Sequence, residues 1–128
     1  MMKVFASLAL GTILLASAAQ AETVRLAVRN LNDTSEEKII DIPDACGLKA
    51  INIGVQGGTF WLWDMTVSYR SPQLKREKFH VNKALRNSAT GWIPLKGKAN
   101  GLCVRRLYLE LEASGPSNNA TVSVFGSR

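Results

Sequence analysis

The sequence predicts an all-β protein: an antiparallel β-sandwich of about seven or eight short strands, with a small β-barrel as the alternative. Three observations predict this class. Apolar residues recur at every second position in several segments, which is the period of a strand. Turn-forming residues separate these segments roughly every 8 to 12 residues. Beyond residue 21, no segment has the apolar period of an amphipathic helix longer than one turn.

The first 21 residues have the three parts of a secretory signal peptide. Lys3 is the early cation, residues 4–16 are apolar, and small residues end at Ala21. The apolar run is shorter than the roughly 20 residues that span a bilayer. We therefore expect cleavage before Glu22, which leaves one domain, residues 22–128, that is periplasmic or secreted and has no transmembrane segment.

Two cysteines, Cys46 and Cys103, are expected to form one disulfide in an oxidising compartment. The bond would close a loop of 58 residues, counting both cysteines. On a chain-entropy estimate such a loop contributes about 4 kcal/mol to stability. A redox pair would have the closer Cys-x-x-Cys spacing. Two cysteines and one histidine are too few for a structural zinc site, so we expect neither metal nor cofactor.

The N-terminal segments of the mature chain predict a strand and a loop. Residues 23–28 alternate, and Val24, Leu26 and Val28 are expected to point inward. Residues 30–37 are rich in turn formers and are expected to form a loop. They lack the Asp-x-Asp-x-Asp-Gly spacing of a calcium-binding loop.

Three further strands are expected before residue 70. Residues 38–42 form the second strand, which ends at Pro43 because proline cannot donate a ladder hydrogen bond. The third strand runs over residues 46–55. Residues 56–58, Gln-Gly-Gly, then predict a hairpin turn into a central strand at residues 59–69, antiparallel to the third.

The central strand is the longest run of aromatic and β-favouring residues. Strict alternation places one set of its side chains in the core: Trp61, Trp63, Met65, Val67 and Tyr69. The other set, on the opposite side, is Leu62, Asp64, Thr66 and Ser68.

Residues 75–81 resume the alternation, and Phe79 and Val81 are expected to point inward. Residues 82–88 predict one short helical turn. Residues 92–95 follow Gly91 and contain a proline, which favours an edge strand.

The last two strands are expected over residues 103–113 and 120–125. The inward residues of the first are Leu107, Leu109 and Leu111. Val104 is out of phase with these leucines, and a bulge near Arg105 and Arg106 would let it also point inward. In the last strand Val122 and Val124 are expected to point inward.

A spaced pattern covers most of the chain from Cys46 to Leu109. Its parts are Cys46-Gly-Leu48, Ile51-x-Ile53, Gly58 with Trp61-x-Trp63, Met65-x-Val67-x-Tyr69, Thr90-Gly-Trp92-Ile93-Pro94-Leu95 and Cys103-Val104-Arg105-Arg106-Leu107. This pattern resembles the YaaI-like family of small secreted bacterial proteins, a domain of unknown function. Within this pattern, Trp61 and Trp63 stand where similar proteins have aliphatic residues, which is a departure from the family. The resemblance implies a periplasmic location and no assigned chemistry, so no catalytic residue is carried over.

Charge is distributed unevenly along the mature chain. Residues 22–69 hold four Lys and Arg against seven Asp and Glu, a net −3, whereas residues 70–128 hold eleven against three, a net +8. The expected binding residues are Arg70, Lys75, Arg76, Lys78, Lys83, Arg86, Lys96, Lys98, Arg105 and Arg106. If they converge, they form a surface for an anionic envelope polymer or another envelope protein; otherwise they are a dispersed basic surface. No nucleic-acid-binding motif is present, so nucleic acid is not an expected partner.

Two alternatives to such a non-enzymatic interaction domain stay open. The first is a carbohydrate-binding module that uses Trp61, Trp63 or Trp92, provided that these residues are exposed rather than buried. The second is a small hydrolase that uses His80, the single histidine, with Asp64. Burial beside the tryptophans could raise the pKa of Asp64, although a solvent-facing carboxylate is the plainer expectation. We expect no enzymatic activity.

Overall fold

The computed structural model describes residues 22–31, 36–71, 75–96, 101–115 and 119–128. The predicted signal peptide, residues 1–21, and the predicted binding residue Lys98 lie outside these ranges. Within them, no helix has the length and apolar character needed to cross a membrane.

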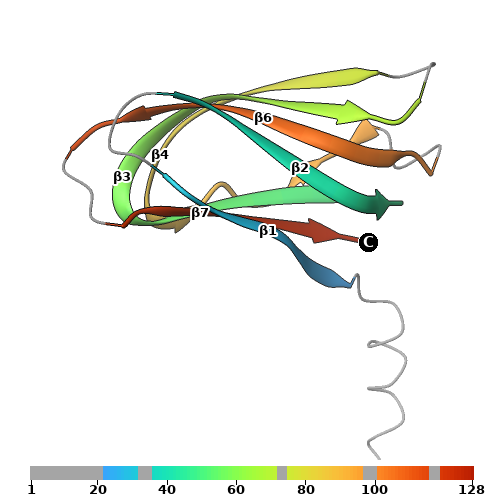
Figure 1. The fold of residues 1–128 in the computed structure, drawn as a ribbon, viewed down its shortest axis with the longest axis horizontal. Coiled ribbons are helices and arrows are strands. Elements are labelled where there is room, and N and C mark those ends of the chain that lie inside the picture. Colours follow the sequence, from blue (N-terminus) through green and yellow to red (C-terminus); the bar gives the residue numbers. More distant parts are fainter. Residues whose placement is uncertain (1–21, 32–35, 72–74, 97–100, 116–118) are drawn as a thin grey trace, which may run out of the picture.

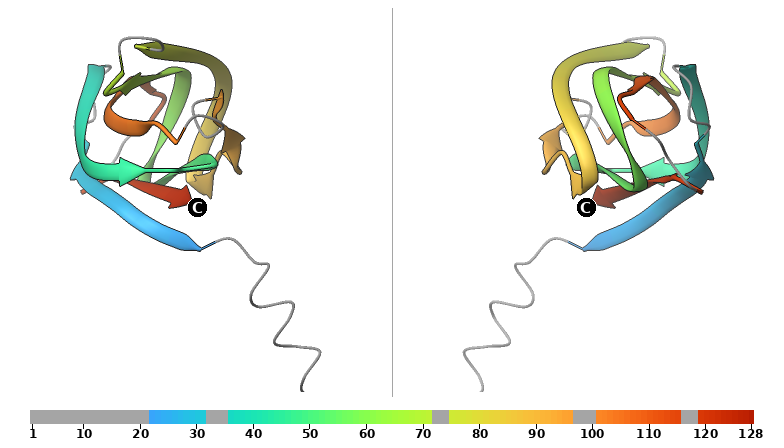
Figure 2. Two further views of the ribbon diagram at one scale, coloured as in Figure 1. Left: turned by 90° about the vertical axis from the view of Figure 1, so that its right-hand side faces the viewer. Right: turned by 90° about the vertical axis from the view of Figure 1, so that its left-hand side faces the viewer.

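Seven strands account for most of the described chain, and every neighbouring pair is antiparallel. They are β1 (Thr23–Asn30), β2 (Glu36–Cys46), β3 (Ala50–Tyr69), β4 (Arg76–Ala89), β5 (Ile93–Pro94), β6 (Cys103–Ala113) and β7 (Thr121–Ser127). They form one sheet in the order β1-β7-β3-β6-β2, and β4 and β5 pair with β3 (Figure 1). The sheet curls so that β1 and β2 come close, and the strands surround a common interior (Figure 2). The all-β prediction is confirmed, in a form close to the small-barrel alternative.

The expected hairpin at residues 56–58 is wrong, because the chain continues there as one strand of 20 residues, β3. The early part of β3 pairs with β7, the later part pairs with β6, and β4 pairs with both parts. Gly57 has a positive φ of 83°, and the register between β3 and β4 shifts between Val55 and Thr59. Gly57 and Gly58 therefore form a bulge at which β3 curls back across the molecule, and its two halves pair with β7 and β6 rather than with each other (Figure 1).

The expectation that Trp61 and Trp63 lie in the core is also wrong. Phe60 and Leu62 are fully buried instead, and both tryptophans are on the outer face. Relative to β6, a register shift between Leu62 and Asp64 then inserts one extra residue of β3 into the alternation. This bulge restores the expected phase for the rest of β3, whose buried residues are Met65, Val67 and Tyr69.

Two smaller differences between the predicted and the observed strands, in β1 and β2, are explained by register shifts and by the edge position of β2. Val28 is 41% exposed and Ala27 is buried, because the register of β1 shifts between Arg25 and Ala27. The strand expected to end at Pro43 continues to Cys46. β2 lies at the end of the strand order and has its own register shift there, which is a setting that tolerates proline.

The short helical turn expected at residues 82–88 is wrong, because this segment belongs to β4. Asn82 and Asn87 have positive φ angles of 55° and 46°. Asparagine adopts this left-handed conformation more readily than most residues, so the strand bends at these positions and continues. Phe79 and Val81 pack against the core as expected.

The core residues of β6 and β7 are buried as the sequence predicts. Arg105 has no ladder partner between Val104 and Arg106 on either neighbouring strand, so the bulge predicted near these arginines is confirmed. Val104 is fully buried as a result. The expected inward residues of β6 and β7 are all buried: Leu107, Leu109, Leu111, Val122 and Val124.

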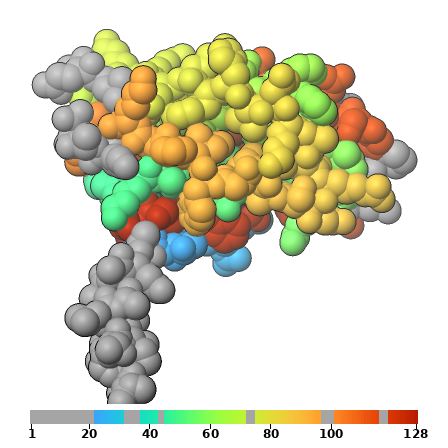
Figure 3. Space-filling model, turned by 180° about the vertical axis from the view of Figure 1, so that it is seen from behind, coloured from blue at the N-terminus to red at the C-terminus, as the bar shows by residue number. Residues whose placement is uncertain are grey.

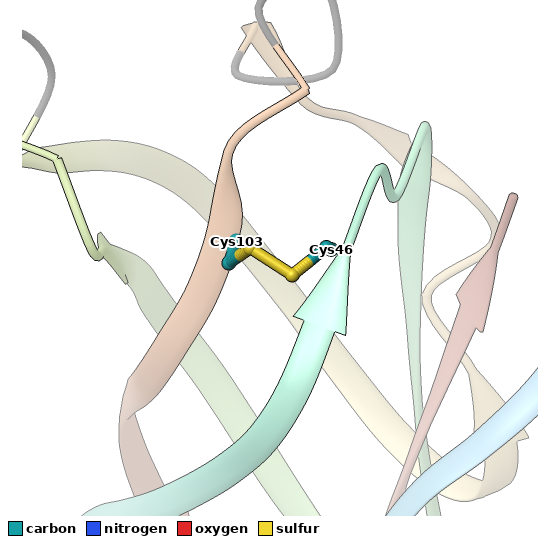
Figure 4. Close-up of a disulfide and its surroundings, with 2 residues drawn as sticks. All are labelled: Cys46 and Cys103. Carbon is teal, nitrogen blue, oxygen red and sulfur yellow. A yellow bond between two sulfur atoms is a disulfide. The ribbon is translucent and has the colours of Figure 1, made fainter.

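The predicted disulfide between Cys46 and Cys103 is confirmed. The two cysteines are direct cross-strand partners, where β2 ends beside the start of β6 (Figure 4). The bond links residues 57 positions apart in the sequence. It therefore ties β2, the last strand in the strand order, to β6, which pairs with β3.

Replacing both cysteines, Cys46→Ser with Cys103→Ser, is expected to lower the free energy of unfolding by about 2–4 kcal/mol, because the unfolded chain regains the entropy of the open loop. Urea unfolding of the oxidised mature domain and of the variant measures the difference. Addition of a reductant should destabilise the wild type and leave the variant unchanged. Equal unfolding midpoints for the two oxidised proteins would contradict the expectation.

Candidate functional site

Four cationic side chains surround one hollow at the end of the sheet where β3 stops. Arg70, Lys75, Arg76 and Arg105 line it together with Ser68, Tyr69 and Ser71. Its volume is about 670 Å³, and no acidic side chain is among its described lining residues. We call this site, defined by its four cationic residues, the cationic hollow.

Backbone hydrogen bonds hold the walls of the cationic hollow in place. The Arg70 amide donates to the Cys103 carbonyl at 2.9 Å, and the Tyr69 amide donates to the Lys75 carbonyl at 2.8 Å. Arg105 is the bulge residue of β6 and projects away from the ladder. Segments more than 30 residues apart in the sequence are thus fixed beside one another.

Two arginines beside the hollow differ in how their charge is used. The Arg76 guanidinium lies 5.0 Å from the centre of the Tyr108 ring, a cation–π contact. The Arg106 Nε donates to Asp41 Oδ1 at 2.7 Å. Hydrogen bonding to Tyr108 and then to Asp41 raises the pKa of Arg106. Asp41 offsets the charge of Arg106, whereas the contact of Arg76 with Tyr108 does not neutralise Arg76.

Four other basic residues of the predicted set lie outside the cationic hollow. Lys78 and Lys83 line a second hollow with Phe79, Val81 and Ile93, and Arg86 lines a third beside Gly57. Lys78, Lys83 and Arg86 all lie within β4, which covers much of one face of the molecule (Figure 3). The exposed Lys96 follows β5, and its amide donates to the Glu77 carboxylate. Of the nine predicted residues that the structure describes, four are therefore gathered at one site.

The tryptophans named in the carbohydrate-binding alternative are at the surface. Trp63 is 44% exposed, Trp92 is 46% exposed, and Trp61 is half-buried. Trp61 and Trp63 lie together, with ring centroids 5.4 Å apart. Trp92 precedes β5, which pairs with the opposite end of β3, at Ala50 and Ile51.

The structure brings Asp64 and His80 together across β3 and β4. His80 Nδ1 lies 2.7 Å from Asp64 Oδ1, and Lys78 Nζ lies 3.8 Å from Asp64 Oδ2. The hydrogen bond with His80 lowers the pKa of Asp64, and this effect outweighs the opposing effect of desolvation. Burial therefore acts in the suggested direction, but the net effect on the Asp64 pKa is a lowering, so the expectation of a raised pKa is wrong.

The Asp64 and His80 pair lacks the other parts of a hydrolytic site. The His80 side chain is 79% exposed. Its Nδ1 is engaged by the Asp64 carboxylate rather than by a serine or threonine hydroxyl. The same residues include no group of three or more His, Cys, Asp and Glu side chains that could hold a metal ion. The pair acts as a cross-strand contact on the outer face of the sheet.

Comparison with known protein families matches residues 4–126 to the family described as Domain of unknown function (DUF2541). No curated protein and no solved structure gives a significant match.

Replacing His80 with alanine is expected to raise the pKa of Asp64 toward its ordinary value of about 3.8, because the hydrogen bond is the main cause of the lowering. A carboxyl ¹³C NMR titration measures this change. Lys78→Ala is the matched control and should raise the pKa less, since the Lys78 charge is a smaller cause. An unchanged Asp64 titration in His80→Ala would contradict the assignment.

The lowered pKa of Asp64 also determines how the stability of the folded chain changes with pH. Ionised Asp64 stabilises the folded chain above the ordinary aspartate pKa, and this contribution is lost as the pH falls through the lower folded-state pKa. The stability difference between wild type and His80→Ala should therefore shrink in strong acid.

Proposed function

We propose that this chain, which belongs to the family described as Domain of unknown function (DUF2541), is a non-enzymatic binding domain that takes anionic groups in its cationic hollow. The groups are phosphates or carboxylates, and their source is a polymer of the cell envelope or another envelope protein. The predicted signal peptide, the confirmed disulfide and the YaaI-like pattern support a periplasmic or secreted location.

The convergence of Arg70, Lys75, Arg76 and Arg105 on one hollow carries this proposal. Four cations gather there with no acidic side chain among the described lining residues, so the hollow keeps a positive potential. Guanidinium groups present several donors in one plane, which matches the oxygens of a carboxylate or a phosphate. Such a site favours an anion.

The hydrolase alternative has one observation in its favour, the 2.7 Å contact between His80 and Asp64. The same contact is explained by pairing across β3 and β4, where these residues are direct partners. Since His80 is largely exposed, the site also lacks the exclusion of water that favours acid–base chemistry. We therefore prefer a binding function.

The test removes three charges from the cationic hollow by Arg70→Gln, Lys75→Gln and Arg105→Gln. Arg76 is left in place because it also packs on Tyr108. We expect at least about a tenfold loss of affinity for immobilised polygalacturonate and polyphosphate, because charge-assisted hydrogen bonds are lost. Surface plasmon resonance at several salt concentrations measures the loss, and wild-type binding should weaken as salt screens the charges.

A matched control removes three charges elsewhere, by Lys49→Gln, Lys83→Gln and Arg86→Gln. These residues are exposed and lie outside the cationic hollow. If the proposal is correct, the control keeps most of the wild-type affinity. An equal loss in both variants would show that net charge alone drives retention, and an absence of wild-type binding to either polyanion would overturn the proposal.

A further inference from the structure

Two tryptophans lie next to each other on the outer face of the sheet, near the middle of β3. Strand alternation points Trp61 outward, since Phe60 and Leu62 are buried on either side of it. The bulge after Leu62 leaves Trp63 and Asp64 both on the outer face. The backbone irregularity thus concentrates aromatic and polar side chains at one place.

Both indoles are held in place by hydrogen bonds to neighbouring strands. Trp61 Nε1 donates to Asn82 Oδ1 on β4 at 3.2 Å. Trp63 Nε1 donates to Glu112 Oε1 on β6 at 2.9 Å. Neighbouring strands are about 4.8 Å apart, so the pair covers a width of three strands, roughly 10 Å. We call this surface, formed by Trp61 and Trp63, the tryptophan platform.

Keeping aromatic side chains exposed to water is energetically unfavourable for the free protein. Trp63 keeps 44% of its surface in contact with solvent. Large apolar side chains at a protein surface mark binding sites when they are clustered rather than scattered. Because hydrogen bonds already hold the indole rings in place, the two tryptophan side chains lose little conformational entropy when a ligand binds. The platform is therefore preorganised for a flat, partly apolar ligand.

Polar groups beside the platform restrict the chemistry of that ligand. Asp64 lies directly between His80 on β4 and Glu110 on β6, and Glu112 follows two residues later. Carboxylates accept hydrogen bonds from hydroxyl groups and repel acidic ligands. The carboxylates of Asp64, Glu110 and Glu112 thus disfavour a polyanion at the platform, and the charge of Lys78 is already paired with Asp64. This surface differs in charge from the cationic hollow.

We propose that the tryptophan platform binds a neutral glycan made of hexose units. The C–H face of a pyranose ring is apolar and stacks on an indole, whereas its hydroxyls lie at the ring edge and reach the flanking polar groups. Asp64, Glu110 and Glu112 accept hydrogen bonds from these hydroxyls. The site is separate from the cationic hollow, so its binding does not depend on the proposed anionic ligand.

The experiment titrates the ¹⁵N-labelled mature domain with cellohexaose, maltohexaose and mannohexaose, to about 10 mM because single stacking sites bind in the millimolar range. The three tryptophans give three indole N–H signals. At least one of these sugars should move the signals of Trp61 and Trp63 and leave that of Trp92 in place. Trp92 is a matched internal control, because it is as exposed as Trp63 but has no aromatic neighbour among the described contacts.

Variants then separate the contribution of aromatic stacking to glycan affinity from the contribution of charge. Trp63→Ala should weaken the affinity for that sugar about tenfold, the scale of one lost aromatic stacking contact. Trp92→Ala and the triple variant of the cationic hollow should bind as the wild type does. Affinity should stay constant across a salt gradient, since the ligand is uncharged. If Trp63→Ala disturbs folding, Trp61→Ala provides the same test, and the dispersed core amide signals report the fold.

Three results would overturn this inference. The first is that none of the hexasaccharides moves the Trp61 and Trp63 signals. The second is an equal movement of the Trp92 signal, which would indicate nonspecific contact. The third is a response to choline or an arginine peptide without a response to any sugar, which would assign the aromatic and acidic groups to a cationic ligand.

Discussion

The structure depends on one strand that belongs to both parts of the sheet. β3 supplies hydrogen-bonding partners to β7 through its first residues and to β6 through its last, and it pairs with β4 along most of its length. Its inward side chains, from Ile51 to Tyr69, run through the core. Because one continuous backbone carries all these contacts, the position of each bulge in β3 decides which side chains reach the interior and which reach the surface.

The sequence predicts the fold class well because alternation is a local property. Leu107, Leu109 and Leu111, together with Val122 and Val124, repeat every second residue and are buried as expected. The cysteine count likewise allows one pairing only. The bulge near Arg105 was also predictable, since Val104 would otherwise have faced water.

The errors arise where a backbone feature depends on distant partners. Gln-Gly-Gly at residues 56–58 fits a hairpin locally, but pairing of the flanking segments with β4 converts it into a bend. Strict alternation back from Met65, Val67 and Tyr69 predicts buried tryptophans, and the bulge at Trp63 that breaks this alternation carries no signal in the sequence. Composition located the basic residues, yet their convergence required three segments to meet: Arg70, Lys75 with Arg76, and Arg105. Only the tertiary fold determines this arrangement.

The continuity of β3 also sets the spacing between the two surfaces. Ser68 lines the cationic hollow, and Trp63 precedes it by five residues on the same strand. At about 3.3 Å per residue, the two surfaces are roughly 16 Å apart along one sheet face. No hinge separates them within β3, so this distance is fixed by the hydrogen-bonded ladder. A polymer with both neutral sugars and acidic groups, once held at one surface, would meet the other at a high effective concentration, and its affinity would exceed that of either group alone.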